Sequence, residues 1–188
     1  AIPWYRTTGM NYWPCYPFPI FLRITFTHIF FLLAVSPSLA GTPIHNDPKG
    51  FLGIPWGVPL ADRTELKEID SVNIVRIFAL KDGRAEIEGI PMESMKLYTF
   101  EGKYARATFH YRGNHTHESL MNFLEAQFGK IDVAQGGMMR GLNQQYTWRG
   151  PDTEITLTYH GFRERGFLTA ESRILAPLYF HAFPDQAY

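Results

Sequence analysis

The chain has 188 residues, of which 45% are hydrophobic and 15% aromatic, and its formal net charge is zero. This length supports one ordinary hydrophobic core and is too short for two. The first 40 residues contain Arg6 and Arg23 but no acidic residue, so the rest of the chain has two more acidic than basic residues. A nucleic-acid-binding protein is not expected, because its affinity depends on clustered Lys and Arg.

The N-terminal 40 residues predict an export signal, with translation expected to start at Met10. An uncharged apolar run, Ile29 to Val35, is followed by small residues at Ser38 and Ala40, the pattern of signal-peptide cleavage. We therefore expect cleavage after Ala40, a periplasmic or secreted protein, and no stable membrane insertion afterwards. An uncleaved anchor that spans Ile20 to Val35 is the alternative.

Thiol chemistry is not expected in the mature chain. Cys15 is the only cysteine, and it precedes the predicted cleavage point. Disulfides, thiolate metal sites and a cysteine nucleophile are then excluded.

After the predicted upstream extension and signal peptide (1–40), we expect a flexible leader (41–50), a single domain (51–176) and an apolar C-terminal tail (177–188). Within the domain, a short helix is predicted from Asp62 to Glu68. The β-branched run from Asn73 to Leu80 predicts a strand, with Arg84 to Ile90 as its hairpin partner. Pro91 should end that ladder, because it has no N–H to donate.

A tight hairpin is predicted next, in which Ser94 to Phe100 and Lys103 to Arg112 flank the turn Glu101-Gly102. The second strand alternates, and its predicted inward face consists of Ala105, Ala107, Phe109 and Tyr111.

A helix is expected from Thr116, which is a good N-cap, to Gly129, which should end it. Its apolar positions repeat at the spacing of a helix that lies on a sheet: Leu120, Phe123, Leu124 and Phe128. The glycine-rich loop from Gln135 to Gly141 lacks a phosphate-binding motif, so we interpret it as a mobile connection.

Three strands are predicted to close the domain, at Gln145 to Arg149, Glu154 to His160, and Gly166 to Leu175. The expected fold is therefore α+β: an antiparallel sheet of about five or more strands, with one short and one longer helix packed on one face.

The opposite sheet face is polar and rich in threonine, arginine and histidine, with few lysines. Such a face suits a protein partner, because arginine makes planar, bidentate contacts that lysine cannot make. The expected partner-binding residues are Arg106, Thr108, His110, Thr147, Arg149, Thr156, Thr158, His160 and Arg173. We expect a non-enzymatic protein of the cell envelope that binds another envelope protein through this face or an edge strand.

Two other functions stay open. His110, His115 and His117 are three imidazoles within eight residues, so a small periplasmic metal-dependent hydrolase is one alternative, although their spacing matches no known ligand motif. A small-ligand-binding module is the other, and it requires Trp56 and Trp148 to face a cavity. Core packing of Trp56, Trp148 and Tyr159 is favoured over an aromatic ligand cage. We predict no catalytic residue and no cofactor, and the oligomeric state stays open.

Several aromatic and glycine motifs carry a resemblance: Gly53-Ile54-Pro55-Trp56-Gly57, Tyr98-x-Phe100 before Gly102, Phe128-Gly129, and Tyr146-x-Trp148. Across residues 51–175 the chain resembles small exported bacterial domains of uncharacterised function. More distantly, it is similar to the small outer-membrane assembly lipoproteins and to β-lactamase-inhibitor-like folds. The resemblance implies a fold and an envelope location, but it carries over no catalytic residue. The chain departs from the lipoproteins because it lacks a lipidated cysteine.

Overall fold

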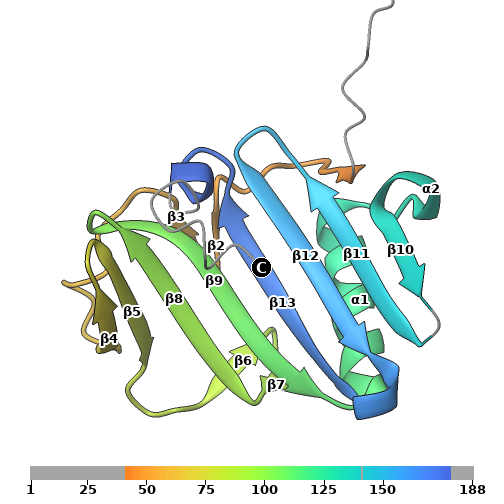
Figure 1. The fold of residues 1–188 in the computed structure, drawn as a ribbon, viewed down its shortest axis with the longest axis horizontal. Coiled ribbons are helices and arrows are strands. Elements are labelled where there is room, and N and C mark those ends of the chain that lie inside the picture. Colours follow the sequence, from red (N-terminus) through yellow and green to blue (C-terminus); the bar gives the residue numbers. More distant parts are fainter. Residues whose placement is uncertain (1–40, 141, 179–188) are drawn as a thin grey trace, which may run out of the picture. The chain divides into compact units, whose positions relative to one another are not determined.

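The computed structural model describes residues 41–140 and 142–178, which belong to one compact unit (Figure 1). The predicted signal segment and cleavage point, together with residues 179–188 of the expected tail, lie outside the described residues. Within the described ranges, no helix has both the length and the apolar character needed to cross a bilayer.

The described chain is dominated by a nine-stranded sheet in which β1, β11, β12, β13, β9, β8, β5 and β4 are neighbours in that order, and β10 also pairs with β11. All of these pairs are antiparallel except β1 with β11, so the sheet is mixed. The strands are β1 (Thr42–Pro43), β4 (Leu66–Val72), β5 (Val75–Leu80), β8 (Ser94–Phe100), β9 (Lys103–Arg112), β10 (Gly137–Arg140), β11 (Asn143–Arg149), β12 (Thr153–His160) and β13 (Arg165–Ser172).

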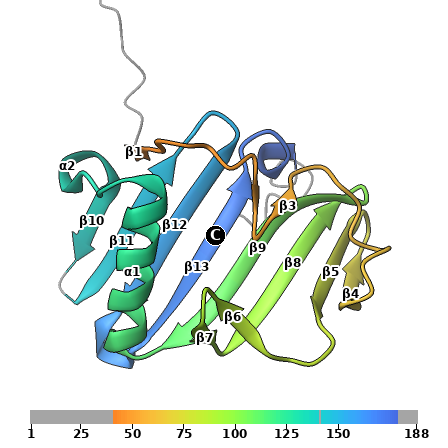
Figure 2. The same cartoon turned by 180° about the vertical axis from the view of Figure 1, so that it is seen from behind.

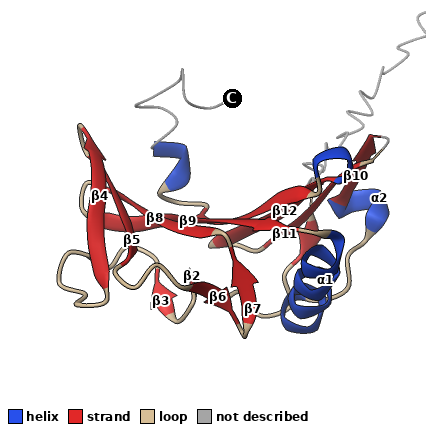
Figure 3. Cartoon of the chain, turned by 90° about the horizontal axis from the view of Figure 1, so that it is seen from below, coloured by secondary structure: helices blue, strands red, loops and turns tan. Residues whose placement is uncertain are grey.

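Two small hairpins and a helix lie on the same side of this sheet (Figures 2 and 3). The hairpins are β2 (Gly50–Phe51) with β3 (Ile54–Pro55), and β6 (Ala85–Ile87) with β7 (Ile90–Met92). The helix is α1 (Asn114–Phe128). A second helix, α2 (Val133–Gly136), immediately precedes β10, and a 3-10 turn, η1 (Gly161–Arg163), joins β12 to β13.

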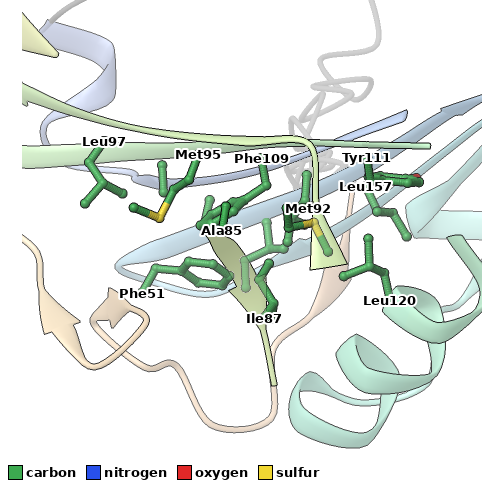
Figure 4. Packing of buried hydrophobic residues seen from close by; sticks show 14 of the residues in the cluster. Phe51, Ala85, Ile87, Met92, Met95, Leu97, Phe109, Tyr111, Leu120 and Leu157 are labelled. Atoms are coloured by element: carbon green, nitrogen blue, oxygen red, sulfur yellow. The ribbon is translucent and has the colours of Figure 1, made fainter. Parts of the chain in front are cut away.

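The core lies between the sheet and this layer of hairpins and helix (Figure 4). Alternate sheet residues such as Phe109, Leu157 and Leu168 are fully buried in it. Leu120 and Leu124 of α1 are also fully buried, as their helical spacing predicts. Burial of one such side chain contributes about 1.5–3 kcal/mol, so this shared core fixes α1 against the sheet.

A bulge in β9 changes the predicted inward face. Tyr98 pairs with Arg106 and Thr99 with Tyr104, so an extra residue stands in β9 at this point. Ala105 therefore does not join Ala107 and Phe109, as predicted, but packs in a second small cluster with Val75 and Phe100. A bulge inserts one residue and reverses the alternation, which a strict two-residue period cannot anticipate.

The α+β class and the predicted large sheet are confirmed, as are the hairpin of β8 and β9 and the three closing strands, within a few residues. The turn residues Glu101 and Gly102 have φ of 50° and 77°, as a two-residue turn of this kind requires. The long helix also forms and ends at Gly129, but it begins at Asn114, two residues before the predicted N-cap. The last strand, predicted to run to Leu175, ends at Ser172, and Ile174 is exposed.

The predicted short helix from Asp62 to Glu68 is wrong. This segment is a turn that leads into β4 at Leu66, where pairing with β5 replaces helical hydrogen bonds. The expected arrangement of one short and one longer helix on one face is therefore not found. α1 contributes side chains to the main core cluster, whereas Val133 of α2 is exposed.

The predicted hairpin partner of the strand from Asn73 to Leu80 is also wrong. Residues 85–87 pair with β7 instead, while β5 lies between β4 and β8. Pro91 does not end a ladder, because it stands in a two-stranded hairpin where its missing N–H breaks no continuous sheet.

The expected flexible leader is bound to the sheet. Thr42 is buried, and its hydroxyl oxygen accepts a hydrogen bond of 2.8 Å from the backbone N–H of Asp132. The expected mobile loop forms α2 and β10. A Cβ at Gly136 would lie 2.4 Å from Thr42 Oγ1, so this glycine allows α2 to approach β1 closely.

Candidate functional site

The sheet side opposite α1 carries the predicted partner-binding residues. Figure 3 shows this side edge-on, with no second layer of strands over β11 and β12. After β13 the chain turns onto this side, where residues 176–178 form a helical turn near β8 and β9 and Leu175 packs against the cluster of Val75, Phe100 and Ala105. We call the outward residues of β9, β11, β12 and β13 the open face. The strand register places them in rows, because directly paired residues share a face.

One row contains four charged side chains in the order Arg149, Glu154, Glu171 and Arg106. Arg149 Nε lies 2.5 Å from Glu154 Oε2, and Arg106 Nη2 lies 3.1 Å from Glu171 Oε2. These four side chains are between 19% and 31% exposed, so solvent screens the pairs only partly. Each arginine is therefore held in place by its own carboxylate.

Proton affinities in this row follow from burial and pairing. Burial raises the pKa of Glu171, although Arg106 beside it acts in the opposite direction. The hydrogen bond to Glu154 raises the pKa of Arg149. The open face thus presents two arginines that are each fixed by a carboxylate.

The next row consists of four directly paired threonines: Thr147, Thr156, Thr169 and Thr108. Thr147 and Thr169 are buried, whereas Thr156 and Thr108 are half-buried. Because these side chains are short and β-branched, the row is low and stiff at χ1. The threonine side chains are shorter than the arginine and glutamate side chains of the neighbouring charged row.

A third row has an aromatic centre. Phe167 pairs with Thr158 on one side and with His110 on the other, and it is half-buried. The Phe167 ring centroid lies 6.2 Å from that of His110 and 6.3 Å from that of His160. Burial lowers the pKa of His110, and the nearby Lys96 acts in the same direction. The open face therefore contains an aromatic group centred on Phe167.

Eight of the nine predicted partner-binding residues lie on the open face, and Arg173 does not. Arg173 follows the end of β13 and donates a hydrogen bond of 2.7 Å to the carbonyl oxygen of Gly150. The prediction missed Phe167. The alternation of β13 could have found it, because Leu168 and Ala170 point inward and therefore place Phe167 outward.

The three histidines of the predicted metal cluster are not brought together. His110 is exposed on the open face, and His115 is exposed on α1, where its Nδ1 lies 3.4 Å from Ser119 Oγ. His117 is only 4% exposed, on the core side of α1. Residues 41–140 and 142–178 contain no group of three or more His, Cys, Asp or Glu side chains that could hold a metal ion.

His117 instead lies in a stack of tyrosine rings between α1 and the sheet. Its Nδ1 atom is 2.7 Å from the Tyr111 hydroxyl, and its Nε2 atom is 3.1 Å from Gln144 Oε1. The Tyr159 ring stacks on the imidazole with centroids 4.5 Å apart. Both ring nitrogens have partners within the protein, so neither is presented to a metal ion.

Burial determines the proton affinities of this stack. It lowers the pKa of His117 and raises the pKa of Tyr111, because the charged form of each group is disfavoured away from water. A Cβ at Gly166 would lie 2.3 Å from the Tyr111 hydroxyl oxygen, so this glycine makes room for the ring. The polar atoms of His117 and Tyr111 thus have hydrogen-bond partners within the core.

The aromatic residues considered for a ligand cage also have partners in the fold. Trp148 is fully buried, and its indole N–H donates to the carbonyl oxygen of Gly129 at 2.8 Å. Trp56 packs on Tyr104 with ring centroids 4.7 Å apart and donates to Thr153 Oγ1 at 2.9 Å. These contacts correspond to the favoured interpretation, core packing.

No protein-family model matches the chain, and comparison with curated proteins and with solved structures gives no significant match. The resemblance to small exported bacterial domains therefore stays a prediction, and the function has to be argued from the geometry.

Proposed function

We propose that the chain is a non-enzymatic module that binds another protein through the open face. The observation that carries this proposal is the row register of β9, β11, β12 and β13, which places paired arginines, a strip of threonines and an aromatic centre on one face of the sheet. Partner-binding surfaces are enriched in aromatic residues and arginine and depleted in lysine, as this face is.

The open face is favoured over the edge strands. β4 is one edge of the large sheet, and its exposed side chains include Lys67, Glu68 and Asp70, with a register shift between Glu68 and Asp70. Charges and bulges of this kind oppose addition of a further strand. At the other end of the sheet, β1 and β10 already occupy the outer side of β11.

The arginine pairs also reduce the cost of binding. An immobilised side chain with many rotamers loses about 0.5–1.5 kcal/mol of entropy on binding. Because Glu154 and Glu171 already hold Arg149 and Arg106, much of this loss occurs on folding. Phe167 supplies the apolar anchor that such interfaces need near their centre.

The proposed partner is a protein of the cell envelope. This part of the proposal rests on the export signal predicted within residues 1–40, which predicts a periplasmic or secreted chain. The metal-dependent hydrolase has less support, because His110, His115 and His117 lie in three different environments.

The test is photo-crosslinking from the surface itself. A photoreactive amino acid at Thr156, in the middle of the threonine row, should yield a discrete cross-linked species that contains a second polypeptide in extracts of the source cells. The same group at Thr64, an exposed loop residue before β4, is the matched control. Equal labelling from both positions, or none from Thr156, would contradict the proposal.

A further inference from the structure

A cleft lies on the side of the sheet opposite the open face, between α1 and the tips of the two small hairpins. Its volume is about 330 Å³. Phe51 and Ile54 line it from β2 and β3, Ile87 lines it from β6, and Phe123 and Phe128 line it from α1. Figure 4 shows Phe51 and Ile87 next to each other on this side of the sheet.

The walls of the cleft are preformed. Both hairpins close through two-residue turns with positive φ, Leu52-Gly53 at 54° and 70° and Glu88-Gly89 at 48° and 78°. Such turns match the twist of the flanking strands. The first hairpin is also tied to the core, because the Phe51 and Phe109 ring centroids are 5.8 Å apart. A ligand would therefore enter without first ordering the walls.

The chemistry of the lining is apolar with one charge. Glu88 is the only ionisable residue among those that line the cleft, and Gln127 supplies the only other polar side chain. Glu88 is exposed, and it takes part in none of the ion pairs formed within residues 41–140 and 142–178. A cationic group on a ligand would find a carboxylate there, whereas a carboxylate on a ligand would meet repulsion.

We propose that this cleft binds a small amphiphilic amine, with its apolar body among the phenylalanine rings and its ammonium group beside Glu88. A volume of 330 Å³ holds roughly eleven groups of the size of a water molecule at about 30 Å³ each. The fitting ligand is thus a medium-chain alkyl or aromatic amine. This site is separate from the open face and does not depend on its function.

The test compares three probes with one alkyl chain and different head groups: octylamine, octanol and octanoate. Calorimetric titration of the chain should give the order octylamine, octanol, octanoate from tightest to weakest. Glu88→Gln should weaken octylamine binding roughly two- to fivefold, as expected for an exposed ion pair, and leave octanol unchanged. Glu86→Gln, an exposed glutamate in the same hairpin that does not line the cleft, should change neither.

A second pair of variants locates the binding. Gln127→Trp should fill the cleft from an exposed helix position and abolish binding of all three probes. Asn122→Trp, exposed on α1 but outside the lining, is its control. No binding by the unaltered chain, binding that survives Gln127→Trp, or equal affinity for octylamine and octanoate would each overturn the proposal.

Discussion

Replacing Gly166 by alanine should be strongly destabilising, although the change adds only one methyl group. The new Cβ would lie 2.3 Å from both Cζ and the hydroxyl oxygen of Tyr111 and 2.4 Å from the carbonyl oxygen of Thr158. Tyr111 must then move away from His117 and from Thr158, with which its hydroxyl forms hydrogen bonds of 2.7 and 3.0 Å.

The magnitude follows from two terms. Overpacking of a core costs about 1–3 kcal/mol, and a buried polar group left without its partner costs about 1–3 kcal/mol. We therefore expect Gly166→Ala to lower the free energy of unfolding by about 3 kcal/mol or more. Gly83→Ala is the control: its φ is 71° and its Cβ would meet nothing within 4 Å, so only the backbone penalty of about 1–2 kcal/mol applies.

Urea unfolding followed by tryptophan fluorescence measures both variants, with the slope m compared to exclude a change in the unfolded state. In a Tyr111→Leu background the effect of Gly166→Ala should shrink by more than 1 kcal/mol, because the crowding ring is gone. A loss below 1 kcal/mol for Gly166→Ala, or full additivity with Tyr111→Leu, would refute the packing of this stack.

Three further predictions concern His117, the charged row and the β4 edge. Burial lowers the pKa of His117 in the folded chain, so the unfolded chain binds the proton more readily and stability should fall as pH drops below about 6.5. His117→Gln should reduce this pH dependence in urea titrations at several pH values, and an unchanged pH dependence would contradict the burial of this imidazole. A double-mutant cycle on Arg149 and Glu154 should give a coupling of about 1 kcal/mol that weakens in high salt, and zero coupling would mean that the arginine is not held. Replacing Lys67, Glu68 and Asp70 by valine should produce self-association visible in sedimentation velocity, and a monodisperse variant would show that these charges do not protect the edge.

Much of the fold could be predicted where local signals agree with tertiary packing. The hairpin at Glu101-Gly102, the apolar stripe of α1 and its end at Gly129 each depend on residues close in sequence. Other features could not be predicted, because the pairing of one strand with another decides them and a single segment does not show that pairing. Leu66 begins a strand instead of continuing a helix because β5 is beside it, and Ala105 changes sides because β9 contains a bulge.

The candidate sites divide in the same way. A two-residue period is enough to place Thr108, Thr156 and His110 on one face of the sheet. It cannot place His117, whose burial depends on Tyr111, Tyr159 and Gln144 from three strands. The cleft beside Glu88 could not be predicted from the sequence either, because its walls come from α1 and two hairpins that are separated along the chain.

The central claim, that the open face binds a protein, is tested most directly by blocking that face without breaking an ion pair. Once photo-crosslinking has identified the partner, its affinity is measured by calorimetry for the unaltered chain, Thr156→Arg and Thr64→Arg. An arginine in the middle of an interface should cost about 3 kcal/mol, so we predict roughly a hundredfold weaker binding for Thr156→Arg and unchanged binding for Thr64→Arg. Equal affinity of all three proteins, with Thr156→Arg folded by circular dichroism, would contradict the account.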